Sequence, residues 1–86
     1  MKAEIVKTLA TMIIDVVGDD VFEIEAGTSF KDDLAFQSIQ FVALAELIQE
    51  RWSEIDFVGW ITSKQVAELL ALRVGDVADF IVHSAA

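Results

Sequence analysis

Apolar side chains recur every three to four residues over residues 3–17 of this chain and again over residues 38–51. This spacing places them on one face of an α-helix. The inner face of the first stretch consists of Ile5, Leu9, Met12, Ile13 and Val16. The inner face of the second consists of Phe41, Leu44, Ala45 and Ile48, with Val42 broadening it. Gly18 follows the first stretch, where a left-handed residue commonly ends a helix, so the spacing predicts two amphipathic helices.

Two further helices are predicted in the C-terminal half. Thr62 and Gln65 have the spacing of a capping box, and the helix that they would begin runs to about Leu70 or Leu72. A last helix is predicted over residues 74–82, with an inner face of Val74, Val77, Phe80 and Ile81. Proline is absent, so no helix is interrupted by its missing N–H and bulky ring.

The connection over residues 18–37 is long and acidic. Loops of this length are uncommon in a compact domain, so we expect apolar side chains to pin it, the candidates being Val21, Phe22, Ile24, Phe30 and Leu34. Residues 52–61, WSEIDFVGWI, are rich in aromatic and β-branched residues and predict a short extended segment or an irregular crossing. The expected fold is all-α, a small three- to four-helix bundle with a long loop between its first and second helices.

Composition bounds the class of protein. The 86 residues predict one domain, 1–86, and its 55% hydrophobic content predicts a dense core. Cysteine is absent, which excludes disulfides and thiolate metal sites. A net charge of −9 disfavours nucleic acid and anionic membranes and favours basic protein partners. The longest run without charge, Leu34 to Ala45, is too short to cross a bilayer. We therefore expect a soluble, cytoplasmic protein.

Few side chains here can perform catalysis. The only histidine, His83, lies three residues from the C-terminus, where chain ends fray. A catalytic serine arrangement would have to recruit it, so we expect no enzyme activity. The acidic residues Asp19, Asp20, Glu23 and Glu25 lack the spacing of a calcium-binding loop, and no metal site is predicted. The four glycines are scattered and form no phosphate-binding loop.

Ser38 stands alone at the predicted start of the second helix and has two interpretations. Serine is a favoured N-cap residue, and such a cap stabilises a helix by about 1 kcal/mol. Alternatively, another enzyme modifies Ser38, in which case it needs no catalytic base of its own. A phosphodiester formed there would face the positive end of the helix dipole and its free N–H groups.

The stretch DDLAFQSIQFVALAELIQE, residues 32–50, resembles the attachment-site region of acyl carrier proteins and related carrier (thiolation) domains. Asp33 and Leu34 match the acid–leucine pair of that family, Ser38 falls on the serine that carries 4′-phosphopantetheine, and Ile39 stands for the leucine after it. The resemblance extends over nearly the whole chain. It includes TSF at residues 28–30 and VGDVADFI at residues 74–81, which is similar to the last helix of the family.

The chain departs from the pattern of the family at several positions. Gln37 replaces the aspartate that helps a phosphopantetheinyl transferase recognise its target, so a general transferase should modify this protein slowly. Gln40 and Ala43 stand where acids often occur, and Arg73 stands where a capping threonine or serine is expected. These departures suggest a specialised polyketide, fatty-acid-like or natural-product pathway.

The resemblance implies a monomeric, non-catalytic carrier that holds an acyl or aminoacyl group as a thioester on phosphopantetheine. Its partners would be the transferase and the synthase enzymes that load and transfer the cargo. Their basic docking surfaces would meet Asp32, Asp33, Glu46 and Glu50. Phe36 and Ile39 would be apolar contacts, unless they fold inward. The face of the second helix would line an acyl cavity or form ordinary core. The alternative function is a helical interaction module that is never modified, in which Ser38 is only a cap.

Overall fold

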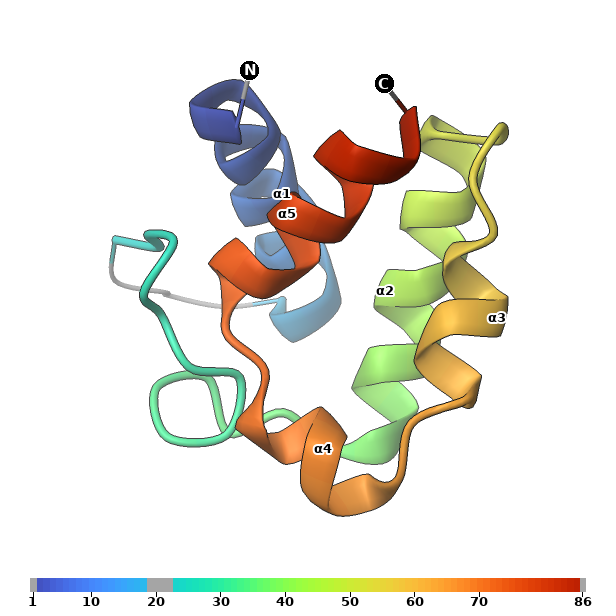
Figure 1. Cartoon of the computed structure of the whole chain (residues 1–86). Helices are drawn as coiled ribbons and strands as arrows, with labels where there is room; N and C mark the ends of the chain where they lie inside the picture. The colour runs from blue at the N-terminus through green and yellow to red at the C-terminus, as the bar shows by residue number, and fades with distance from the viewer. Residues whose placement is uncertain (1, 19–22, 86) are drawn as a thin grey trace.

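The computed structural model describes residues 2–18 and 23–85, and within them it consists of helices joined by loops and turns (Figure 1). The helices are α1 (Lys2–Val17), α2 (Ser38–Arg51), α3 (Phe57–Thr62), α4 (Val66–Ala71) and α5 (Val74–Ala85). The predicted all-α bundle with a long loop between its first two helices is confirmed. The described residues form five helices, because residues 57–62 form a helix that the sequence pattern did not predict.

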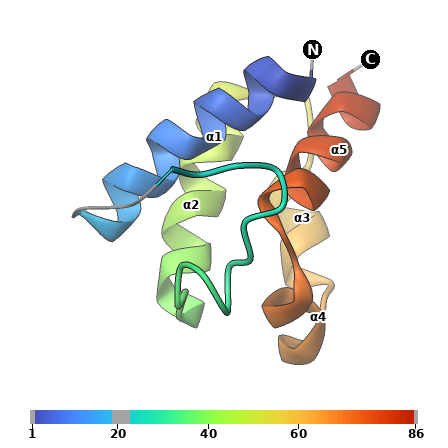
Figure 2. The ribbon, with the colours of Figure 1, turned by 90° about the vertical axis from the view of Figure 1, so that its left-hand side faces the viewer.

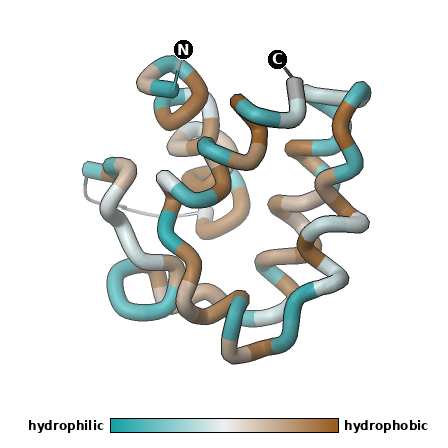
Figure 3. The backbone as a smooth tube through the Cα atoms, viewed as in Figure 1, coloured by the Kyte–Doolittle hydropathy of each residue, from teal (hydrophilic) through white to brown (hydrophobic). Residues whose placement is uncertain are grey.

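The bundle is built around α1 and α2. Helix α1 packs against α5 and α2, while α3 packs against α2 from the other side (Figures 1 and 2). Hydrophobic residues recur among hydrophilic ones along α1, α2 and α5, as expected of amphipathic helices (Figure 3). The beginning of α1 and the end of α5 lie at the same end of the molecule, where Lys2 Nζ is 3.0 Å from Asp79 Oδ1. Both side chains are about half exposed, so this ion pair contributes little stability.

Helices α1 and α2 have the predicted bounds to within one residue. Leu9 and Ile13 are buried in the inner face of α1, and Gly18 ends it with φ at +73°. The inner face of α2 is buried as predicted, except that Val42 is 58% exposed. The prediction for Val42 was wrong because each residue turns the helix by about 100°, which carries Val42 well away from the centre of the buried stripe.

The segment between α2 and α5 differs from the prediction. Residues 57–62 are helical, neither extended nor irregular, because Asp56 caps them: its Oδ1 accepts a hydrogen bond from Gly59 N at 3.0 Å. Thr62 ends α3 and does not begin the next helix. The capping box lies three residues later, where Gln65 N donates to Glu68 Oε1 at 2.9 Å. Both pairs have the spacing of the motif, so spacing alone could not choose between them.

The long loop is joined to the link before α5 by backbone hydrogen bonds. Phe30 N donates to Leu72 O at 3.3 Å, Val74 N to Thr28 O at 3.0 Å, and Gly75 N to Ala26 O at 2.7 Å. We call this pairing of residues 26–30 with residues 72–75 the seam. Phe30 and Leu34 are buried and Ile24 is half-buried, as predicted. Val21 and Phe22 lie outside the described residues.

Candidate functional site

Ser38 is the first residue of α2 and is exposed to solvent. Gln37, with extended backbone, is the N-cap residue, so the interpretation of Ser38 as the cap is wrong by one position. Gln37 N donates to Gln40 Oε1 at 2.7 Å, and Gln37 O accepts from Gln40 N and Phe41 N. Within the part of the chain that the structure describes, no hydrogen bond involves the Ser38 hydroxyl. The hydroxyl is therefore accessible from solvent.

A tight turn positions the approach to Ser38. Ser29 N donates to Asp33 Oδ2 at 2.7 Å, and Asp32 N donates to Ser29 Oγ at 3.0 Å. Ala35 adopts a left-handed conformation with φ at +51°, and Phe36 N then donates to Phe30 O at 2.8 Å. Asp33 thus has a structural role in this turn besides any contact with a partner.

Of the two alternatives for Phe36, a contact for partners is wrong and the inward orientation is confirmed. Its side chain is 4% exposed, and its ring centroid lies 5.1 Å from that of Phe30 and 5.1 Å from that of Phe41. The three rings pack edge to face or tilted, the preferred geometry for aromatic pairs. Phe36 therefore anchors the beginning of α2 to the core and is not available to a partner. Its inward orientation depends on how the loop folds Phe30 and Phe36 back onto Phe41 of α2, which spacing does not reveal.

The outer side of α2 carries an exposed apolar surface with an acidic border. Ile39 is 74% and Val42 58% exposed, and Val58 of α3 is 41% exposed. Glu46, Gln49, Glu50 and Val58 line a shallow groove of about 360 Å³ between α2 and α3. We call the outer side of α2 together with Val58 the docking face. The predicted contacts Ile39, Glu46 and Glu50 lie on it, and sequence reasoning missed Val42 and Val58. The helical spacing would have placed Val42 there.

The two remaining predicted acids lie in the loop. Asp32 and Asp33 are exposed and precede α2, and Asp32 also borders a second pocket, with Lys31 and Arg73. The structure therefore divides the four acidic residues into two groups. Asp32 and Asp33 are near the start of α2, and Glu46 and Glu50 are farther along it.

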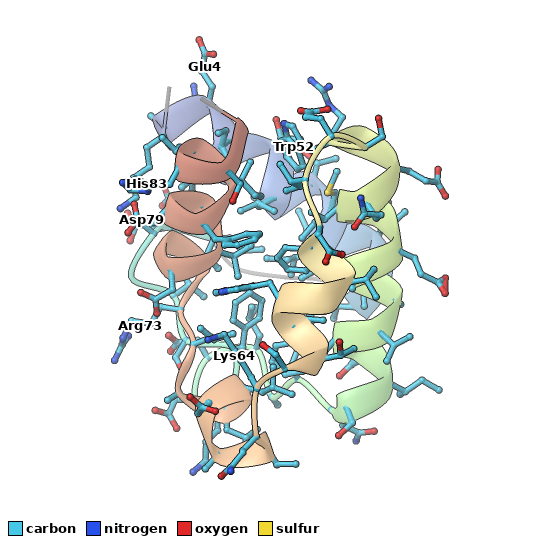
Figure 4. All side chains as sticks on the ribbon, turned by 45° about the vertical axis from the view of Figure 1, so that its right-hand side comes forward. Glu4, Trp52, Lys64, Arg73, Asp79 and His83 are labelled. Carbon is cyan, nitrogen blue, oxygen red and sulfur yellow. The ribbon has the colours of Figure 1, made fainter. Side chains whose placement is uncertain are left out.

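His83 lies far from Ser38. Figures 1 and 2 place the end of α5 and the beginning of α2 at opposite ends of the molecule. The His83 Nδ1 atom lies 2.7 Å from Asp79 O, within its own helix (Figure 4). Among the described residues, no three potential metal-ligating side chains come together. The acids Asp19 and Asp20 lie outside these residues.

Comparison of the chain with protein-family models, curated proteins and solved structures found no match. None of the helices in the described residues is long and apolar enough to span a bilayer. Any assignment of function therefore depends on the geometry around Ser38 and on the resemblance of residues 32–50.

Proposed function

We propose that this protein is a carrier of acyl or aminoacyl groups and that Ser38 is the attachment site of its 4′-phosphopantetheine. The observation that carries the proposal is the position of Ser38. It is exposed, its hydroxyl makes no hydrogen bond among the described residues, and it begins a four-turn amphipathic helix. Once bound, the group supplies the thiol that a chain without cysteine lacks, and the cargo is held on it as a thioester.

The residues around Ser38 fit a phosphodiester. The backbone N–H groups of Ser38 and Ile39 belong to the first turn of α2 and have no acceptor within the helix. That turn contains no acidic side chain, so a phosphate there meets the positive end of the helix dipole without a like charge beside it. The Phe36 anchor and the turn at Asp33 keep the serine in place at the helix start.

The docking face supports transient recognition by partner enzymes. Ile39 and Val42 supply apolar contacts, while Glu46 and Glu50 complement basic surfaces on a synthase or transferase. A net charge of −9 also speeds the encounter with a basic partner at low salt. The acids and apolar residues lie on the helix that begins at Ser38, so a docked enzyme has access to that residue.

Gln37 favours a second candidate function, that of an interaction module which is never modified. Its uncharged side chain removes the ion pair that a transferase would form with an aspartate at this position. In that case Ile39, Val42 and Val58 still bind a partner, and Ser38 is simply a residue of the first turn.

One experiment separates these functions. The protein is incubated with coenzyme A, Mg²⁺ and a broad-specificity phosphopantetheinyl transferase, and its intact mass is measured. The transferase forms a phosphodiester between Ser38 Oγ and the phosphopantetheine and releases adenosine 3′,5′-bisphosphate. We expect a mass gain of one phosphopantetheine.

Two variants locate the modification. Ser38→Ala should lose the mass gain while keeping its fold, because the Ser38 side chain is exposed and makes no hydrogen bond among the described residues. Ser53→Ala removes another exposed hydroxyl, in the turn after α2, and should be modified as fast as the original chain. The carrier function is refuted if a panel of transferases gives no gain, or if Ser38→Ala still gains the mass.

A further inference from the structure

A pocket of about 430 Å³ lies between the long loop and α4, apart from the docking face. Lys31 and Asp32 border it from the loop, Ala67, Leu70 and Ala71 from α4, and Arg73 from the link to α5. This volume falls in the usual range of small-molecule sites. Figures 1 and 2 both place the loop, α4 and the beginning of α2 at the same end of the molecule.

Helix α4 contributes an apolar wall that the protein itself leaves uncovered. None of the residues of α4 is buried, and five of its six residues are apolar. Ala67 and Ala71 are exposed and Leu70 is half-buried on the side that borders the pocket. A short two-turn helix of this composition would ordinarily bury such a face, so the wall is suited to an apolar ligand.

The opposite wall carries positive charge in an otherwise acidic protein. The chain has 6 lysines and arginines against 15 acids, and two of those cations, Lys31 and Arg73, border this pocket. Arg73 Nη1 donates to Gly27 O at 2.6 Å, which fixes the guanidinium beside the seam (Figure 4). Asp32 offsets one of the two charges. Among the residues that border the pocket the balance is one positive charge, while the carboxylates of Asp33 and Asp76 accept from the backbone N–H groups of Ser29 and Arg73.

We propose that this pocket binds the carboxylate end of a short aliphatic chain. The carboxylate lies between Lys31 and Arg73, and the methylene groups lie against Ala67, Leu70 and Ala71. A guanidinium and an ammonium both donate to carboxylate oxygens, and the guanidinium is fixed in place before the ligand arrives. The proposal does not depend on modification of Ser38.

Titration of the unmodified protein with hexanoate, followed by two-dimensional amide NMR, tests the proposal. The amides of Lys31, Ala67, Ala71 and Arg73 should shift together, with a dissociation constant on the order of millimolar for so small a ligand. Hexanamide has the same chain without the charge and should bind about two- to fivefold more weakly, the usual effect of an exposed charge pair.

Three variants test which charges affect hexanoate binding, and each should change the affinity differently. Lys31→Gln should weaken hexanoate binding about two- to fivefold, while Asp32→Asn should strengthen it by a similar factor. Neither side chain makes a hydrogen bond or ion pair among the described residues, so both variants should fold. Lys7→Gln removes the same charge from α1 and should leave binding unchanged. The proposal is refuted if hexanamide binds as well as hexanoate, if Lys31→Gln and Lys7→Gln behave alike, or if the shifts map elsewhere.

A second series identifies the source of the carboxylate. Protein loaded at Ser38 with an acyl group that ends in a carboxylate should bind added hexanoate more weakly than protein loaded with a methyl-ended group of equal length. That result would show that the pocket receives the free end of the tethered cargo, which the tether holds at high local concentration. Equal binding by both forms would show that the natural ligand is a free acid. In either case, the titration of unmodified protein shows whether the pocket binds the carboxylate.

Discussion

Trp60 of α3 and Phe80 of α5 stack with their ring centroids 4.3 Å apart and their planes inclined by 14°. Phe57 contacts both rings, and Lys64 Nζ lies 4.5 Å from the centre of the Trp60 ring. The stack joins the short helix α3 to the last helix, α5, although the backbones of these two helices make few contacts with each other. Neither aromatic residue is fully buried, yet the pair connects two parts of the bundle.

Removal of either ring should therefore destabilise the whole bundle. We expect Trp60→Ala and Phe80→Ala each to lower the free energy of unfolding by about 2–3 kcal/mol, somewhat less than for a fully buried ring. The double variant should lose less than the sum, with a coupling of about 0.5–1.5 kcal/mol for a stacked pair. Urea unfolding followed by circular dichroism measures these values. Val66→Ala, at a highly exposed position, should change stability by less than about 0.5 kcal/mol.

Gln49 should contribute more to the stability of the fold than its half-exposed position in α2 suggests. Its Oε1 accepts from Phe57 N at 3.0 Å and from Val58 N at 3.3 Å, and its Nε2 donates to Ile55 O. Gln49→Ala leaves these backbone groups without partners, and we expect a loss of about 1–3 kcal/mol in urea unfolding. Gln49→Glu keeps the acceptor and should lose less than Gln49→Ala. Equal losses in the two variants would contradict this account.

Ala35 is strained, and glycine should relieve the strain. The residue is left-handed at φ +51°, a region that costs an L-residue about 1–2 kcal/mol and costs glycine almost nothing. After allowance for the greater flexibility of unfolded glycine, we expect Ala35→Gly to stabilise the protein by about 0.5–1 kcal/mol. Ala35→Val should destabilise it, because a β-branched residue tolerates this conformation poorly. Thermal and urea unfolding of the three proteins should give the order glycine, alanine, valine.

Gly75 should not tolerate a side chain, although it lies in a helix. A Cβ at this position would lie 2.9 Å from Ala26 O and 3.2 Å from Ala26 Cβ, across the seam. The gain of about 1 kcal/mol in helix propensity is then outweighed, and we expect Gly75→Ala to destabilise the protein by about 1–3 kcal/mol overall. Gly27→Ala is the matched control, because its Cβ would meet nothing within 4 Å. If Gly75→Ala were instead more stable than the original chain, the seam must shift to make room for the added methyl group.

Gln37→Asp should change both stability and modification. Aspartate is a better N-cap than glutamine and places a negative charge at the helix start, which should stabilise the protein by about 0.5–1 kcal/mol. Under the proposed function, a general transferase should also modify Ser38 faster in this variant. Rates come from intact mass over time. Glu46→Gln, which removes one negative charge from the docking face, should not speed modification. Identical rates for Gln37→Asp and the original chain would remove Gln37 as the explanation for slow modification.

The three longer helices were predictable because each buries one continuous stripe, and a stripe is visible as periodic spacing. Helix α3 was not, since it is only six residues long and owes its stability to tertiary contacts. A helix was predicted in the region of α4, but its start was placed at Thr62, whereas the structure begins it at Val66. Phe57 and Ile61 of α3 are buried by other elements, and Asp56 supplies the cap. At the site, the exposure of Ser38 and Ile39 followed from their place at the helix start. The burial of Phe36 did not, because it requires Phe30 and Phe41 to meet it.

The seam has a consequence for the order in which the chain folds. It pairs residues 26–30 with residues 72–75, and the Arg73 contact to Gly27 alone spans 46 positions. Such distant pairings form late, because a long stretch of chain must first be brought into a closed loop. The turn that leads to Ser38 is anchored through Ser29 and Phe30, so it acquires its final shape only after α5 has been synthesised and docked. Under the proposed function, arrival of the last helix thus sets the earliest moment at which a transferase can meet a fully organised Ser38.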